Sequence, residues 1–304
     1  MSTFEQQLRK VCKHCKPSSL KTYHANVKAL ARIAKVGPPV PTNKRWLSSA
    51  LLKQVAAMPL QKYKRFSMAG VKALQAYGAK DQTWEAAMRD STEKYSRIRD
   101  SGRRTQREKK NWPSGGYAAL SKLARELHEE VEHLETKKKT LSASELYQYQ
   151  RYFIILFYSK HALRGDLADV RIKKPLGPNW INAKGSQLHI GEHKTAKARG
   201  PIEIKLAEPV QKALGHFLPM VKARTTHGFL LSTLRTGNRL RREDMLKILR
   251  NTTFERLGKK LGVQLIRVLK TTESKAEIDR AHALQMELGH SAGMQRRYIS
   301  RANQ

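Results

Sequence analysis

The sequence predicts a mainly α-helical protein with a small β-sheet, divided into two domains. Three observations lead to this prediction. Apolar residues recur at three-to-four spacing along most of the chain, which is the period of a helix with one buried face. Over residues 187–206 the spacing changes to alternation, the period of a β-strand. Between the two halves, residues 97–116 combine a dense run of charge with helix-breaking residues.

The first hundred residues carry helical patterns and no convincing strand. The stretch "KPSSLKTYHANVKALARIAKVG" ends at Gly37 before two prolines, and its apolar residues fall on one helical face: Leu20, Tyr23, Val27, Leu30 and Ile33. The stretches "NKRWLSSALLKQVAAM" and "KYKRFSMAGVKALQAYG" repeat the pattern. We therefore expect a bundle of short helices whose polar faces are strongly cationic.

The domain boundary is expected in a basic linker. The segment "RIRDSGRRTQREKK", residues 97–110, holds seven basic and two acidic residues and precedes "NWPSGGY", in which proline and glycines break any helix. The first domain, with this linker, is predicted to span 1–107, and the second 112–304.

The second domain is expected to begin with two long helices and then to change period. One helix is predicted from Tyr117 to about Leu134, and another begins near Ser142 and is apolar enough to be a buried central helix. The stretch "SQLHIGEHKTAKARGPIEIKL" alternates on both sides of a basic turn, which indicates a β-hairpin. Helical patterns return from Pro209 onward.

Net charge is the most informative bulk property. The chain has 60 Lys and Arg against 25 Asp and Glu, a formal charge of +35. A chain this basic repels itself unless a polyanion relieves it, so nucleic acid is the expected partner. The charge alone would suit a ribosome-associated protein equally well. Apolar runs are too short for a membrane span, and the first residues lack a signal-peptide core, so we expect an intracellular protein that does not associate with membranes.

Two cysteines form one C-x-x-C motif, Cys12 and Cys15, with His14 inside it. A structural zinc site would need a second pair of ligands at fixed spacing, and the sequence has none at such a distance. We therefore expect two reduced thiols and no metal.

A single arginine, Arg164, follows the predicted buried helix in "HALRGDLADVRI". A guanidinium remains charged at any accessible pH, so it needs an anion there. The simplest partner is Asp166 or Asp169, through a salt bridge. A second explanation is an external phosphate.

Further residues favour the phosphate. Lys194 lies in the hairpin turn, Arg267 follows an apolar pair in "QLIRVLKTT", and "LGHSAGMQRRYIS" supplies His290 and Tyr298. Together with Arg164 they form a set suited to phosphoryl transfer, in which arginines stabilise the phosphorus oxygens and a tyrosine attacks.

At these residues the sequence resembles the tyrosine recombinases, or phage-integrase family, whose catalytic domain is shared with type IB topoisomerases. The resemblance rests on the order and spacing of "ALRGDLADV", "GEHKTAKARGPIEI", "QLIRVLKTT" and "LGHS…Y", and it covers about residues 112–302. The N-terminal bundle is similar to the family's core-binding domain in position, size and charge, which would make it a DNA-binding domain.

The resemblance implies a role for each residue. Arg164 and Arg267 would bind the scissile phosphate, Lys194 would protonate the leaving 5′ oxygen, and His290 would donate a hydrogen bond or handle a proton. Tyr298 would be the nucleophile that forms a 3′-phosphotyrosyl bond. Such chemistry uses no metal, ATP or other cofactor, because the phosphotyrosyl bond conserves the energy of the phosphodiester.

The sequence departs from the family pattern at three places. Gln264 stands where the family usually has a histidine, and an amide can donate a hydrogen bond but cannot shuttle a proton. Asp166 follows Arg164 by two positions instead of the usual three. Tyr298 follows His290 by eight positions instead of the more common nine, which would rotate it by about 100° in a helix.

Other residues are weaker candidates. Lys197 lies in the same turn as Lys194 and is an alternative to it, and Lys270 would share a helical face with Arg267 as a second phosphate contact. His193 and His282 are expected to be surface or hairpin residues and not ligands.

The resemblance thus implies a site-specific DNA recombinase or integrase, of a virus or mobile element, that acts on double-stranded DNA. It would form a homo-tetramer on DNA and a monomer or weak oligomer when free, in the host nucleus or, in a bacterium, the cytoplasm. Because only six residues follow Tyr298, we expect protomer coupling to use another element or to be looser than is usual. The alternatives are a type IB-like topoisomerase, a catalytically inactive DNA-binding relative and, least favoured, a basic RNA-associated protein.

Overall fold

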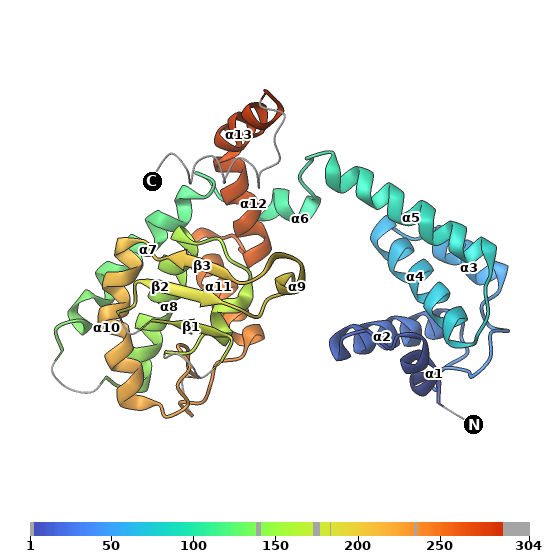
Figure 1. Cartoon of the computed structure of the whole chain (residues 1–304), viewed down its shortest axis with the longest axis horizontal. Helices are drawn as coiled ribbons and strands as arrows, with labels where there is room; N and C mark the ends of the chain where they lie inside the picture. Colours follow the sequence, from blue (N-terminus) through green and yellow to red (C-terminus); the bar gives the residue numbers. More distant parts are fainter. Residues whose placement is uncertain (1–2, 138–140, 173–176, 183, 234–235, 288–304) are drawn as a thin grey trace. The chain divides into compact units, whose positions relative to one another are not determined.

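The computed structural model describes residues 3–137, 141–172, 177–182, 184–233 and 236–287 (Figure 1). Its buried apolar side chains form two separate cores. Unit 1 spans Met1–Arg104 and unit 2 spans Thr105–Gln304. The segment expected to be a linker is largely helical in this structure: its start belongs to α5 (Gln82–Asp100), and α6 (Gln106–Asn111) follows with a Thr105 capping box.

Unit 1 consists of helices and connecting loops in its described residues. It contains α1 (Phe4–Val11), α2 (Pro17–Ile33), α3 (Ser49–Ala56), α4 (Leu60–Ala76) and α5. The other four helices pack on α4, whose buried face includes Phe66 and Leu74. Gly70 on this face lies against the buried Trp84 ring, where a Cβ would come within 2.2 Å of a ring carbon. The close approach of α4 and α5 therefore needs a glycine.

Unit 2 is built around the buried helix α8 (Ala143–Lys160), capped by Ser142. It packs against α7 (Ala118–Val131), α10 (Glu208–Arg224) and α11 (Arg242–Leu257). Two short 3₁₀ helices, η1 (Glu132–Leu134) and η2 (Gly165–Asp169), follow α7 and α8. The last described helices are α12 (Val263–Glu273) and α13 (Lys275–Glu287), and α13 buries none of its side chains.

The small sheet confirms the predicted hairpin and adds a strand. β2 (Gln187–Ile190) pairs antiparallel with β3 (Ile202–Lys205), with Leu188 opposite Ile204, and the short helix α9 (Ala196–Arg199) lies in the connection. β1 (Asn179–Ile181), which the sequence analysis does not predict, pairs antiparallel with β2. The coarse prediction of a mainly helical fold with a small sheet is confirmed.

Candidate catalytic site

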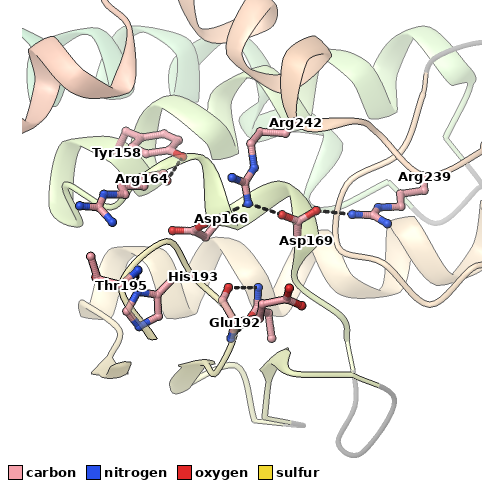
Figure 2. Close-up of polar contacts among 10 residues, drawn as sticks. Tyr158, Arg164, Asp166, Asp169, Glu192, His193, Thr195, Arg239 and Arg242 are labelled. Atoms are coloured by element: carbon pink, nitrogen blue, oxygen red, sulfur yellow. Dashed lines mark hydrogen bonds and ion pairs between the residues drawn. The ribbon is translucent and has the colours of Figure 1, made fainter. Parts of the chain in front are cut away.

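Arg164 lies in the extended segment between α8 and η2, where its backbone occupies the N-cap position of η2. Its side chain is half-buried. Tyr158, on the last turn of α8, donates a hydrogen bond from Oη to the Arg164 carbonyl at 2.9 Å. Among the described residues, the Arg164 guanidinium has neither a hydrogen bond nor an ion pair, and Figure 2 shows it extending away from the neighbouring carboxylates.

The two nearby aspartates are occupied by other arginines. Asp166 accepts a hydrogen bond from Arg242 of α11 at 3.0 Å, and Asp169 pairs with both Arg242 and Arg239 (Figure 2). The salt bridge from Arg164 to either aspartate is therefore absent, because α11 packs on η2 and supplies the counter-charge. Arg164 is left available for another anion.

Gly165 allows Arg242 to reach the aspartates. A Cβ at this position would lie 3.1 Å from Cγ and 3.2 Å from Cδ of the Arg242 side chain. The arginine stem thus passes close to the backbone at Gly165, and a side chain at this position would require the stem to shift by a few tenths of an ångström.

Lys194 lies in the turn between β2 and α9, as predicted, and is exposed. Lys197, the alternative, is also exposed and belongs to α9. His193, which precedes Lys194, lies in the hairpin, one of its two expected positions, and its side chain is buried there.

Gln264 and Arg267 lie one turn apart on α12, which is anchored by its buried residues Leu265, Ile266 and Leu269. Gln264 is exposed, and its Oε1 lies 3.4 Å from a guanidinium nitrogen of the half-buried Arg267. In the described part of the chain Arg267 has no carboxylate partner. Lys270 shares this helix, as expected, and its ammonium pairs with Glu273 at 2.9 Å.

Two tyrosines connect the segment of Arg164 with α12. Tyr117 donates a hydrogen bond from Oη to the Tyr158 carbonyl at 2.8 Å, and Tyr158 in turn holds the Arg164 carbonyl. The Lys270 ammonium lies 5.0 Å from the centre of the Tyr117 ring. Burial, followed by the Glu273 carboxylate, raises the pKa of Tyr117 to about 12, so its hydroxyl stays a hydrogen-bond donor at neutral pH.

Two of the predicted residues, His290 and Tyr298, lie outside the described residues. Of the others, Gln264 and Arg267 are the one pair that a hydrogen bond joins among the described residues. Arg164 and Lys194 reach no other predicted site residue through a hydrogen bond or ion pair there.

Several residues that surround the predicted set carry no signal in the sequence. Arg239, Arg242, Tyr117 and Asn179 each act across a long sequence separation; Arg242, for example, is 76 positions from Asp166. No periodicity in a single sequence carries that information. Within the described ranges there is no group of three or more His, Cys, Asp or Glu side chains suited to hold a metal, and none of the described helices is long and apolar enough to cross a membrane.

Comparison with known proteins returns a weak structural similarity. No protein-family model matches the sequence, and no curated protein matches it. Among solved structures, the crystal structure of XerA recombinase aligns over 95% of this chain and 89% of its own, with a TM-score of 0.38 and 13% sequence identity.

Proposed function

We propose that this protein is a DNA strand-breaking and rejoining enzyme, a site-specific recombinase or integrase that works through a 3′-phosphotyrosyl intermediate. Its substrate would be double-stranded DNA, consistent with a formal charge of +35. In this proposal the N-terminal helical unit supplies further contacts to the DNA backbone.

The proposed reaction exchanges one phosphodiester for another. Oη of Tyr298 attacks the scissile phosphorus, the bond from phosphorus to the 5′ oxygen breaks, and Lys194 gives that oxygen a proton. Arg164 and Arg267 stabilise the charge on the non-bridging oxygens. Gln264 can donate a hydrogen bond there, while His290 is left to accept the tyrosine proton because an amide cannot.

One observation carries this proposal: two half-buried arginines, on separate elements, have no carboxylate partner among the described residues. The lack of a carboxylate partner is more informative at Arg164 than at Arg267, because two aspartates lie only two and five positions away. Both aspartates are paired with Arg242 or Arg239 instead. A half-buried guanidinium left without a counter-charge suits an anion from outside the chain, and a phosphate fits its planar fork.

The test is covalent capture of DNA. Wild-type protein is incubated with a pool of nicked duplexes of randomised sequence, denatured and recovered, and the attached DNA is sequenced. We expect an adduct enriched for one sequence, its loss in Tyr298→Phe, and its retention in Tyr147→Phe, a half-buried tyrosine of α8 to which we assign no role.

Three other outcomes would contradict parts of the proposal. Tight, salt-sensitive DNA binding without any adduct would indicate a catalytically inactive relative. An adduct that persists in Tyr298→Phe would assign the nucleophile elsewhere. Relaxation of supercoiled plasmid by protein too dilute to associate would favour a topoisomerase over a recombinase.

A further inference from the structure

The turn that carries Lys194 is held on both sides by buried polar side chains. Lys194 itself is exposed, and in the described part of the chain its ammonium has no hydrogen bond or ion pair. The backbone around it is fixed by two residues to which the sequence analysis gives no role in the site, His193 and Asn179. The side chain is thus free while its point of attachment is fixed.

His193 closes the turn from within. Its side chain is 7% exposed, and Nε2 lies 2.9 Å from the carbonyl oxygen of Gly200, on the far side of α9. A carbonyl accepts, so Nε2 carries the proton and Nδ1 is the acceptor. Nδ1 then accepts from the backbone N–H and the hydroxyl of Thr195, at 3.4 and 3.2 Å. The ring therefore ties together the residues on either side of Lys194 and the end of its turn.

Asn179 fixes the start of the turn from the neighbouring strand β1. It is 3% exposed, its Oδ1 accepts from the Glu192 N–H at 2.9 Å, and its Nδ2 donates to the Glu192 carbonyl at 3.2 Å. One residue earlier, Gly191 donates its N–H to the Pro178 carbonyl at 2.8 Å. A Cβ at Gly191 would lie 2.7 Å from that carbonyl oxygen, so the approach needs a glycine.

These contacts satisfy both ring nitrogens of His193 and both ends of the Asn179 amide. A buried polar network with every member bonded favours one arrangement of the backbone over others. Figure 2 shows His193, Glu192 and Thr195 grouped in this turn. A surface turn that needed only to connect β2 and β3 would not require two buried polar side chains for its support.

We infer that His193 and Asn179 are positioning residues for Lys194. Together they fix the backbone from which the lysine side chain extends, and so its position relative to the leaving oxygen. The inference rests on the proposed function, because it takes Lys194 as the general acid. His193 itself would touch neither DNA nor the reacting atoms.

The test separates leaving-group protonation from general stability. Two nicked duplexes of the captured sequence are compared, one with the natural 5′ bridging oxygen at the scissile phosphate and one with sulfur in its place. A thiolate leaves without a proton, because thiols have pKa values near 8–9. Loss of the general acid, or of its position, should therefore slow cleavage of the oxygen substrate and spare the sulfur substrate.

We expect His193→Ala to cleave the oxygen substrate about 10²-fold more slowly than wild type, the scale of a misplaced catalytic group, and the sulfur substrate at close to the wild-type rate. Lys194→Ala should show the same pattern with a larger loss. His193→Gln, whose amide can still reach the Gly200 carbonyl, should recover most of the rate. The matched control is Arg199→Ala, which removes an exposed cation from the same turn and should affect both substrates equally.

Other patterns would overturn the inference. If His193→Ala slows both substrates equally, or neither, the histidine does not act through the leaving group. If His193→Ala fails to fold, Asn179→Ala and His193→Gln are measured instead. If Asn179→Ala cleaves the sulfur substrate as slowly, relative to wild type, as the oxygen substrate, the inference is contradicted. If Lys194→Ala is not rescued by sulfur while an adduct still forms at Tyr298, the role of Lys194 is wrong and the inference fails although strand cleavage stands.

Discussion

Replacing Arg242 by methionine tests whether this residue of α11 supplies the counter-charge for the aspartates beside Arg164. The Asp166 side chain is only 6% exposed, and Arg242 is its ion-pair partner at 3.0 Å. Breaking a buried pair from one side costs about 3–5 kcal/mol, since a charge stays buried without compensation. Because the Arg242 side chain is 43% exposed, water can replace part of its effect, and we expect a loss of about 2–3 kcal/mol.

Differential scanning calorimetry of the full chain measures this loss. For a unit of this size, about 1 kcal/mol lowers the midpoint by roughly 2–4 °C, so the unit 2 transition should fall by about 5–10 °C. The unit 1 transition serves as an internal reference. Arg241→Met is the matched control, because Arg241 is exposed and has no ion pair among the described residues.

Removing the aspartate charge at the same time should reverse most of the effect. In Asp166→Asn combined with Arg242→Met no unpaired carboxylate is left at this position, so the midpoint should recover most of its fall. If Arg242→Met unfolds within about 1 °C of Arg241→Met, the ion pair between Asp166 and Arg242 contributes little to stability. In that case this ion pair does not explain why Arg164 and Asp166 are not paired with each other.

Two further predictions concern the end of α8. Tyr158→Phe removes the hydroxyl that donates a hydrogen bond to the Arg164 carbonyl, and urea unfolding should show a loss of about 1–2 kcal/mol. The substitution should also slow adduct formation more than it weakens DNA binding. Equal effects on binding and cleavage would contradict this prediction. Burial, with the charge of Lys160, lowers the pKa of His161, and its Nε2 accepts a hydrogen bond from the Ala207 N–H. Because protonation is harder in the folded state, the stability that His161 adds is complete above about pH 6.5 and is lost as the pH falls. His161→Gln should flatten the fall in urea midpoint from pH 7 to 5, and an unchanged slope would exclude His161 as its source.

Much of the fold could be predicted because local pattern determines it. The three-to-four spacing of apolar residues locates α2, α7 and α8, and the alternation around residues 187–206 locates the hairpin that presents Lys194. The spacing of Gln264 and Arg267 is a local property as well, so their contact on one face of α12 follows from the sequence.

The surroundings of the site could not be predicted, because they depend on tertiary pairing. Either aspartate near Arg164 is a reasonable partner for it by sequence, and only the packing of α11 on η2 shows that Arg242 takes that place. β1 has three residues, too few for a periodicity to appear, so Asn179 gave no signal. The hairpin position of His193 is expected from the sequence as one of two alternatives, but its burial and its hydrogen bond to the Gly200 carbonyl depend on how the turn folds back on itself.

The site of DNA attachment tests the central claim most directly. The captured adduct would be digested with nuclease and trypsin, and the modified peptide located by mass spectrometry. The proposed function predicts a nucleotide joined through its 3′ phosphate to the tryptic peptide 298–301, which contains Tyr298 as its only tyrosine. Attachment at another residue, or through a 5′ phosphate, would contradict the proposed mechanism.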